Sequence, residues 1–274
     1  MTKGSEDECR LPPDGSPVLG ARASSPAPAD GSASAPGPAP AGGSGPTLEG
    51  PWGFLDAGAV EPALNMAFDE AMLNAAATRS APQLRWYGWQ SSAATFGYFQ
   101  HHGEIASLTR IRPLLRRPTG GGLVPHLADW TYALVVPPGH EWYGLRAPES
   151  YERMHRWLQR AFALCGVATA VATCCEVAGP GQCFIGWEKF DLLQGGRKIA
   201  GAAQRRNKLG LLIQGSIQPV PSGVDRAGFA RALQEAATYD WGVTWEPADA
   251  ATWQAAAEEL VRVKYADAAY HARR

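Results

Sequence analysis

Apolar residues recur every three or four positions in several stretches of the chain, as they do on one face of an amphipathic helix. The first stretch begins near Pro62, a residue that favours the first turn of a helix. Its apolar positions are Leu64, Ala67, Phe68, Ala71, Met72 and Ala75. A second helix is predicted to start at a Ser150 cap and to end at Gly166. We also expect helices over residues 225–236 and 250–265.

Short runs rich in β-branched, aliphatic and aromatic residues predict strands between these helices. The runs cover residues 84–87, 94–99, 131–136, 190–194, 198–204 and 211–218. Gly, Ser or Pro stands at most of their edges, where turns are expected. Because the helices are interspersed among strands that hairpins can connect, we predict an α+β fold rather than a regular βαβ alternation.

A change of composition divides the chain near residue 50. All 24 residues from 23 to 46 except Asp30 are Ala, Gly, Pro or Ser. Such residues bury too little apolar area to offset the entropy lost on folding. We therefore expect residues 1–49 to form a disordered tail. Aromatic and aliphatic residues appear throughout residues 50–274, which are long enough for one domain with its own core.

Charge and hydropathy exclude several classes of partner. The 25 Lys and Arg residues balance 26 Asp and Glu residues, so no overall basic field attracts nucleic acid or anionic lipid. No apolar run approaches the roughly 18 residues that span a bilayer, and the start of the chain lacks the apolar core of a signal peptide. We expect a cytoplasmic protein with no membrane or nucleic-acid partner. Its odd number of cysteines, five, predicts reduced thiols.

A glycine-rich loop lies between a basic pair and a histidine. Residues 116–126 read Arg-Arg-Pro-Thr-Gly-Gly-Gly-Leu-Val-Pro-His. Because glycine has no Cβ atom and tolerates positive φ, such a loop lets backbone amides approach a ligand closely. Arg116 and Arg117 add donors for a carboxylate, a phosphate or a pantetheine-linked acyl group. A surface turn with a solvated basic pair and a structural His126 is the alternative interpretation.

A lysine and a cysteine are the other candidates for chemistry. Lys198 follows a Gly-Gly turn and precedes small residues, so its ammonium can reach a shielded pocket; a surface hairpin with a solvated lysine is the alternative interpretation. Cys183 follows Gly-Pro-Gly, in a position that suits an accessible nucleophile. Cys165 is expected to pack on its helix. The pair Cys174 and Cys175 lacks CxxC spacing and a histidine pair, so we predict no metal site.

Four motifs follow one another in a fixed order. They are Leu-Asn-Met-Ala-Phe-Asp-Glu-Ala at 64–71, Leu-Arg-Trp-Tyr-Gly-Trp at 84–89 with Phe-Gly-Tyr-Phe-Gln at 96–100, the glycine-rich loop, and Gly-Arg-Lys-Ile-Ala-Gly at 196–201 with Ala-Gln-Arg at 203–205. Over residues 52–264 the chain resembles the lipoate/biotin protein ligase superfamily, in its branch of lipoate-protein ligases and octanoyltransferases. The resemblance implies a mixed sheet flanked by helices, as in biotin synthetases and class II aminoacyl-tRNA synthetases.

The resemblance also implies a tunnel for an acyl chain, walled by the glycine-rich loop and the lysine strand. Its implied lining is Arg116, Thr119, Gly120, Gly121, Gly122, His126, Gly201 and Ala203. Lys198 is implied to point at the acyl carbonyl. A C8 chain needs a narrow apolar slot with a few polar groups at its mouth, which fits these roles.

One branch of the family is a single domain with a Cys-Phe pair before the lysine strand, and Cys183-Phe184 match it. The resemblance therefore favours a monomeric acyltransferase with a catalytic pair, Cys183 and Lys198. It would take an octanoyl or lipoyl group from an acyl carrier protein and pass it to a lysine of a lipoyl domain or glycine-cleavage H protein. Exchange between thioesters is nearly isoenergetic and the amide product is lower in energy, so no cofactor is expected.

The main alternative is an ATP-dependent lipoate-protein ligase that forms a lipoyl-adenylate with ATP and Mg²⁺. Such ligases commonly carry a C-terminal accessory domain, for which we expect no room here. A non-catalytic module that binds an acyl group or carrier, and a biotin ligase, are further alternatives. Of the transferase, ligase and module, the transferase alone requires Cys183. One departure from the family also stands out, because Leu127 follows His126 where an acidic residue is usual, and the nearest acid is Asp129.

Overall fold

The computed structural model of the chain describes residues 51–177, 184 and 186–273. The chain divides into two units, Met1–Thr47 and Leu48–Arg274, and the description below concerns the second. The predicted disordered tail, residues 1–49, lies outside the described residues.

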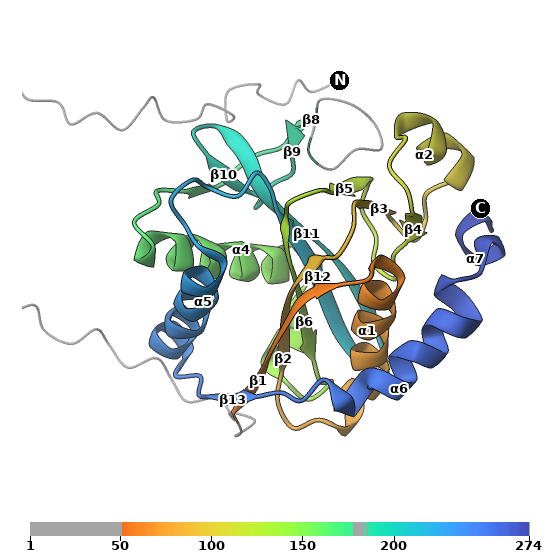
Figure 1. The fold of residues 1–274 in the computed structure, drawn as a ribbon. Helices are drawn as coiled ribbons and strands as arrows, with labels where there is room; N and C mark the ends of the chain where they lie inside the picture. The colour runs from red at the N-terminus through yellow and green to blue at the C-terminus, as the bar shows by residue number, and fades with distance from the viewer. Residues whose placement is uncertain (1–50, 178–183, 185, 274) are drawn as a thin grey trace, which may run out of the picture. The chain divides into compact units, whose positions relative to one another are not determined.

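A mixed sheet of eight strands forms the centre of the domain (Figure 1). In spatial order the strands are β13 (Trp245–Pro247), β1 (Trp52–Val60), β2 (Gln83–Trp89), β6 (Trp130–Val136), β12 (Gly210–Ile217), β11 (Arg197–Asn207), β10 (Leu192–Gln194) and β7 (Ala170–Val171). β13, β1 and β2 are parallel, whereas every neighbouring pair from β2 to β7 is antiparallel. The long antiparallel hairpin of β11 and β12 brings residues of both strands to the candidate site.

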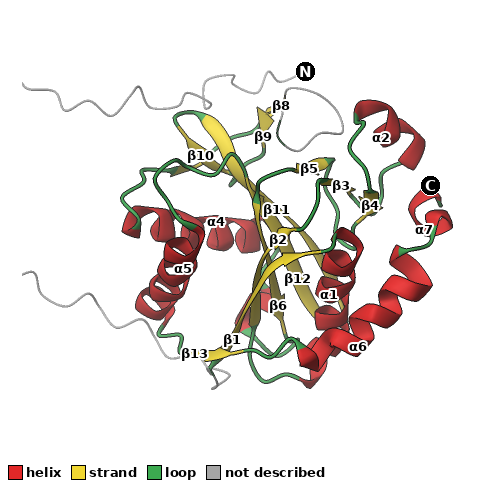
Figure 2. Cartoon of the chain, in the orientation of Figure 1, coloured by secondary structure: helices red, strands yellow, loops and turns green. Residues whose placement is uncertain are grey.

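Helices cover both faces of this sheet (Figure 2). α1 (Pro62–Ala75) and α6 (Ala251–Leu260) lie on one face, and α4 (Ala147–Leu164) and α5 (Arg226–Trp241) lie on the other. Shorter elements are α2 (His102–Leu108), α3 (Glu141–Gly144), α7 (Ala268–Ala272), a 3₁₀ turn at Ala76–Thr78 and a π-helical turn at Val261–Tyr265. This arrangement confirms the predicted α+β class with a mixed sheet flanked by helices.

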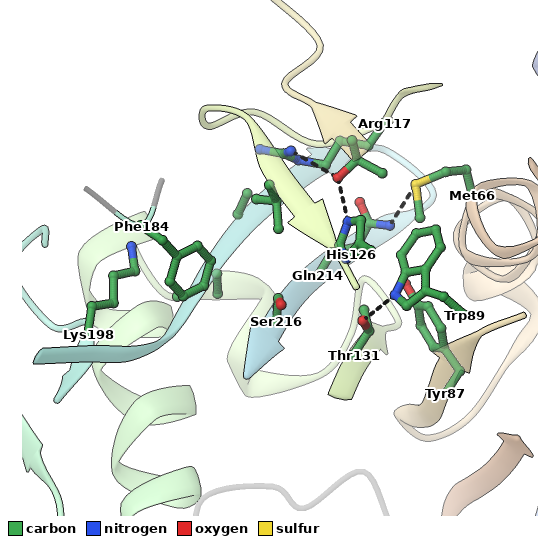
Figure 3. A pocket seen from close by; sticks show the side chains of 16 residues that line it. Met66, Tyr87, Trp89, Arg117, His126, Thr131, Phe184, Lys198, Gln214 and Ser216 are labelled. Atoms are coloured by element: carbon green, nitrogen blue, oxygen red, sulfur yellow. Dashed lines mark hydrogen bonds between the residues drawn. The ribbon is translucent and has the colours of Figure 1, made fainter. Parts of the chain in front are cut away.

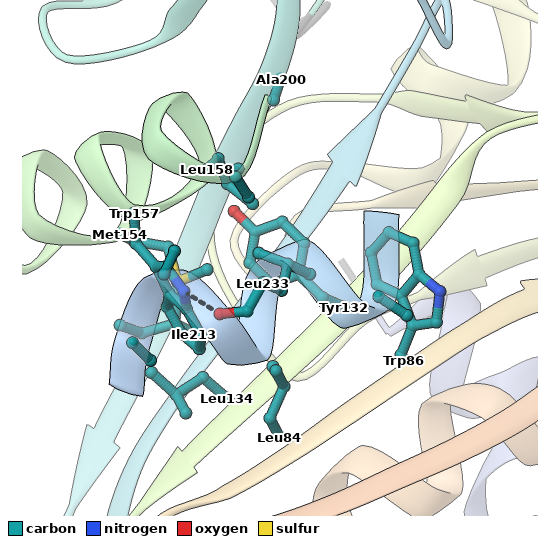
Figure 4. Close-up of a cluster of buried hydrophobic side chains, with 14 of the residues drawn as sticks. Leu84, Trp86, Tyr132, Leu134, Met154, Trp157, Leu158, Ala200, Ile213 and Leu233 are labelled. Carbon is teal, nitrogen blue, oxygen red and sulfur yellow. Dashed lines mark hydrogen bonds between the residues drawn. The ribbon is translucent and has the colours of Figure 1, made fainter. Parts of the chain in front are cut away.

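Alternating residues of the strands supply two separate cores, because successive side chains of a strand point to opposite faces. On the α4 and α5 side, Trp86 and Tyr132 pack with Met154, Trp157 and Leu233 (Figure 4). The Trp157 indole donates to the Leu233 carbonyl oxygen at 2.7 Å. On the other side of the sheet, the apolar residues of α1 pack on Tyr87, Ala133, Val135 and Leu212. Tyr87 and Ala133 directly follow Trp86 and Tyr132 in the sequence, so their side chains point to the opposite face.

Two small sheets complete the fold. β4 (Leu114–Arg116), β3 (Ala93–Phe96) and β5 (Val124–His126) form one of them, and the glycine-rich loop connects β4 to β5. β8 (Glu176–Val177) and β9 (Gly186–Trp187) form the other. The loop therefore has a strand at each end, and both strands pair with β3.

Several predicted element boundaries are wrong, and three of them have a clear physical reason. Ser150 lies inside α4, because the helix begins at Ala147 and Arg146 caps it in a capping box with Glu149. Residues 97–99 form a turn, since the close approach of Gly97 to the glycine-rich loop ends β3. Phe190 has φ of 76°, so the chain turns there and β10 begins two residues later.

The cysteines differ from expectation at one position. Cys165 and Cys175 are free thiols, whereas Cys174 is disulfide-bonded. The expectation of reduced thiols is therefore wrong for Cys174, because an odd number of cysteines argues against complete pairing but not against one bridge. In the described part of the chain, no helix has the length and apolar character needed to cross a membrane.

Candidate active site

A pocket lies where β11 and β12 face the small sheet of β3, β4 and β5 (Figure 3). Met66, Tyr87, Trp89 and Val124 give it apolar walls, and the backbone of residues 201–203 forms part of another wall. Thr95, Arg117, His126, Thr131, Gln214 and Ser216 supply the polar groups along its sides.

Lys198 lines one end of this pocket, opposite the cluster of Tyr87, Trp89 and Met66 (Figure 3). Its Nζ atom lies 2.6 Å from Oδ2 of Asp191, and both side chains are almost fully buried. The Phe184 ring lies beside it, with its centroid 5.0 Å from Nζ. The Lys198 ammonium therefore lies at one end of the pocket, and the large side chains of Tyr87, Trp89 and Met66 lie at the other.

His126 is held from three sides at the pocket wall. Its Nδ1 atom lies 2.8 Å from Oδ2 of Asp129 and its Nε2 atom 2.9 Å from Oγ1 of Thr95. Because a carboxylate only accepts hydrogen bonds, Nδ1 carries the proton that is donated to Asp129. The Trp89 indole stacks on the imidazole with ring centroids 3.8 Å apart. His126 is thus fixed in orientation and buried.

Asp129 is the acidic partner of His126. Its Oδ2 atom accepts hydrogen bonds from Ser216 at 2.7 Å and Thr131 at 3.0 Å, besides the one from His126. Burial raises the pKa of this carboxyl, but the His126 charge and the three hydrogen bonds outweigh burial, so the pKa is lowered. The acid nearest to His126 in the sequence is therefore also its partner in the structure.

The glycine-rich loop is anchored behind the pocket wall. Thr119 is fully buried and donates from Oγ1 to Oε1 of Gln214 at 2.7 Å. Gln214 in turn donates from Nε2 to Oδ2 of Asp69 on α1 at 2.7 Å. Gly97 lies against Gly121, where an added Cβ atom would meet the Gly121 carbonyl oxygen. Thr119, Gly120, Gly121 and Gly122 do not line the pocket themselves; they belong to the loop that carries its wall.

The two arginines before this loop have different surroundings. Arg117 lines the pocket, and its guanidinium donates to the Gly120 carbonyl oxygen. Arg116 lies outside the lining: its guanidinium donates to the carbonyl oxygens of Tyr98, Gln100 and His271. Its backbone N–H also donates to Nδ1 of His271 at 3.0 Å, which ties α7 to the start of the loop.

The structure brings together four of the residues predicted for the site. Lys198, His126, Gly201 and Ala203 line the same pocket. Cys183 lies outside the described residues, although Phe184, which follows it in the sequence, is described and lines the pocket. In the part of the chain that the structure describes, no group of three His, Cys, Asp or Glu side chains is arranged to hold a metal ion.

Sequence reasoning missed Asp191, Trp89 and Gln214 as members of the site. Asp191 precedes β10, and the pairing of Leu192 with Ala200 places it beside the lysine strand. A hairpin assignment for residues 190–204 would have indicated this neighbour. Gln214 and Trp89 gave no comparable indication, because their places in the site depend on how the sheets assemble.

The chain is similar to known proteins in its family, its sequence and its fold. Residues 61–239 match the lipoyl protein ligase A/B catalytic domain. The octanoyltransferase LipM of Geobacillus kaustophilus is 32% identical over 179 residues, which cover 61% of this chain and 64% of that protein. The octanoyltransferase LipM of Bacillus subtilis is 31% identical, with the same coverage. This chain thus spans a little under two thirds of the length of the curated relatives it matches.

Solved structures share the fold. Lipoate-protein ligase A bound with ATP superposes with a TM-score of 0.66 at 20% identity, covering 82% of this chain and 98% of the other. The bi-partite lipoate protein ligase from Thermoplasma acidophilum, solved with its E2 lipoyl domain, gives a TM-score of 0.61 at 18% identity, with 81% and 96% coverage. At these identities the likeness concerns the fold alone.

Proposed function

The chain belongs to the lipoyl protein ligase A/B catalytic domain family, and from this premise we propose that it is an octanoyl- or lipoyl-protein acyltransferase. The named function of its curated relatives, octanoyl transfer, supports the proposal. The observation that carries it is the polarity of the pocket, which has the large side chains of Tyr87, Trp89 and Met66 at one end and the Lys198 ammonium at the other.

This polarity sets the direction in which an acyl chain binds. The hydrocarbon tail lies against Tyr87, Met66 and Trp89, since burial of apolar surface stabilises it there. The carbonyl group lies at the Lys198 end, where an ammonium stabilises the negative charge that develops on the carbonyl oxygen. Cys183 precedes Phe184, a residue of that same end, and is the proposed nucleophile.

The proposed reaction has two acyl transfers. The Cys183 thiolate attacks the carbonyl carbon of a carrier-protein thioester, a new C–S bond forms, and the carrier thiolate leaves. The amine of an acceptor lysine, on a lipoyl domain or glycine-cleavage H protein, then attacks the acyl-enzyme. The amine nitrogen forms the amide bond, the C–S bond to Cys183 breaks to release the thiolate, and the proton lost by the amine balances the carrier thiolate released in the first transfer. The donor and acceptor bonds balance without ATP, so no cofactor is required.

Intact-mass measurement tests this function. Incubation with octanoyl carrier protein and no ATP is expected to add one octanoyl group to the wild type, and hydroxylamine is expected to remove it. Cys183→Ala abolishes the adduct. Cys175→Ala is the matched control, because Cys175 is an exposed free thiol in the same region of the sequence, and it retains the adduct.

The same experiment decides between the transferase and the ATP-dependent ligase. Acyl transfer to a lipoyl domain that appears only with free octanoic acid, ATP and Mg²⁺, and that survives Cys183→Ala, contradicts the transferase. Binding of octanoate with no transfer under either condition contradicts both enzymes and leaves a binding module.

A further inference from the structure

The ion pair between Lys198 and Asp191 lies at the junction of two cavities. Lys198 and Phe184 line the pocket proposed to hold the acyl chain, called the acyl pocket below. Both residues also line a second, outer cavity, which Leu127, Trp187 and Pro219 border. A group that passes from the outer cavity to the acyl pocket therefore meets the Lys198 ammonium. The position of that ammonium is set by its contact with Asp191, with Nζ 2.6 Å from Oδ2.

Gly201 provides the space in which the lysine side chain lies. A Cβ atom at this position would be 2.6 Å from Cε and 2.7 Å from Nζ of Lys198, and 3.1 Å from Oδ1 of Asp191. The Lys198 side chain therefore extends along its own strand and lies over Gly201, three residues further on. The small residue at 201 thus makes room for the lysine and its carboxylate partner.

The carboxylate of Asp191 is held independently of the lysine. Its Oδ2 atom accepts a hydrogen bond from the Glu188 backbone N–H at 2.7 Å, within a turn in which the Asp191 N–H donates to the Glu188 carbonyl oxygen. The Ala172 N–H donates to the Asp191 carbonyl oxygen at 2.8 Å, and this contact fixes the turn to the end of β7. A rigid turn thus presents the acceptor, and the flexible lysine side chain adapts to it.

We infer that Asp191 is a positioning residue for acyl transfer, which holds the Lys198 ammonium at the entrance of the acyl pocket; this rests on the proposed function. An ammonium has three N–H donors. The contact with Asp191 uses one of them, which leaves donors for the carbonyl oxygen of the bound acyl group. No proton moves in this role: the ammonium stabilises the oxyanion while the C–S bonds form and break.

The other groups that face this pair are uncharged at neutral pH. His155 of α4 donates from Nδ1 to the Phe190 carbonyl oxygen, and burial lowers its pKa to about 4. Tyr132 of β6 is buried, and burial raises its pKa. Arg197 and Glu188, the neighbours in sequence, are exposed. Among the described residues, Asp191 alone forms an ion pair with Lys198.

Asp191→Asn tests this role, since asparagine keeps an acceptor for the Glu188 N–H but removes the charge. The rate constant of octanoyl-enzyme formation is expected to fall about 100-fold, because displacement of a catalytic group by about 1 Å has effects of this size. The KM for the carrier-protein donor stays within about twofold of wild type. Asp191→Glu restores part of the rate. Glu188→Gln, which removes a charge from the same turn, leaves the rate unchanged.

A spectroscopic measurement tests the contact without activity. The chain has five lysines, so ¹⁵N-lysine labelling gives few side-chain signals, and Lys198→Arg assigns one of them. The Lys198 ammonium protons are expected to exchange slowly with water in wild type and Glu188→Gln, and rapidly in Asp191→Asn. Equal exchange in wild type and Asp191→Asn, or an Asp191→Asn rate at or above that of wild type, overturns the inference.

The two proposals fail in different ways. A wild type that forms no octanoyl adduct contradicts the proposed function, and the exchange rates then still decide whether Asp191 holds Lys198. An adduct that forms equally well in wild type and Asp191→Asn supports the function and contradicts the positioning role.

Discussion

At Gly97 an added Cβ atom would lie 1.9 Å from the Gly121 carbonyl oxygen, well inside contact distance. The obstructing atom belongs to the backbone of the glycine-rich loop and cannot swing aside as a side chain can. The approach of these two glycines therefore sets how closely the loop lies against the turn after β3. The position of the loop in turn fixes Thr119 and the pocket wall behind it.

Gly97→Ala is therefore expected to lower the free energy of unfolding by about 1–3 kcal/mol, the usual cost of forcing atoms into a packed region. The variant is also expected to bind octanoate more weakly, because the loop moves. Urea unfolding and calorimetric titration measure the two effects. Gly103→Ala is the matched control: nothing lies within 4 Å of an added Cβ atom in this helical position, so stability is unchanged or higher.

His155 makes the stability of the domain depend on pH. Burial is the main cause that lowers its pKa from 6.5 to about 4, and the nearby Lys198 charge adds to the effect. The unfolded chain therefore binds a proton in the range between these two values, whereas the folded protein does not. The contribution is present above pH 6.5 and is lost as the pH falls toward 4.

From this shift we predict that the wild type loses about 3 kcal/mol of unfolding free energy between pH 7 and pH 4 on account of His155. His155→Gln is expected to show a shallower dependence of stability on pH over the same range. Urea unfolding at several pH values measures both slopes. Parallel slopes for the two proteins would show that His155 does not carry this dependence.

Helix α1 is joined to the sheet by a buried charged network as well as by its apolar stripe. Asp69 forms an ion pair with Arg85 of β2 at 2.8 Å, and both side chains are fully buried. The Tyr87 hydroxyl and Gln214 donate to the other carboxylate oxygen. Since Gln214 also accepts from Thr119, the network runs from α1 through β12 to the glycine-rich loop.

Asp69→Asn leaves the Arg85 charge buried without its partner, so we expect a loss of about 3–5 kcal/mol in the free energy of unfolding. The double variant Asp69→Asn/Arg85→Met is expected to be more stable than Asp69→Asn alone, because both charges are then gone. A double-mutant cycle from urea unfolding measures the coupling. Additive effects of the two substitutions would contradict the network.

The elements that the sequence predicts well are those with a regular apolar pattern. α1 follows from its apolar spacing, and β2, β6 and β12 follow from short runs rich in apolar and aromatic residues, because these strands are buried along most of their length. The start of α4 does not, since Arg146 and Glu149 form a cap that no serine marks, while Ser150 donates to Gln204 of β11 instead. A tertiary contact there outweighs the local preference of serine.

The sequence likewise predicts some residues of the site but not others. The motif residues Lys198 and His126 reach the pocket, but the motif cannot tell which of two adjacent arginines faces it. Arg117 does so because Arg116 is held by the carbonyl oxygens of residues from the turn after β3 and from α7. Asp129 was visible in the sequence only as a displaced acid; its role as the partner of His126 depends on the turn between β5 and β6.

The whole domain is expected to fold without the first unit of the chain. Residues from Trp52 onward supply the sheet and its cores, and Trp52 itself packs among Trp142, Trp157, Trp241 and Trp245. Deletion of residues 1–47 is therefore predicted to change the thermal midpoint by less than about 2 °C. Deletion of residues 1–60 removes β1 and abolishes cooperative unfolding. Differential scanning calorimetry compares the two truncations.

The contacts between His271 and Arg116 join residues that lie 155 positions apart in the sequence. A ribosome adds about 5–20 residues per second, so roughly eight to thirty seconds separate the synthesis of the two partners. During that time the glycine-rich loop has been made but lacks one of its anchors. The nascent chain thus cannot complete the wall of its acyl pocket, and the finished site is acquired only as the last helix emerges.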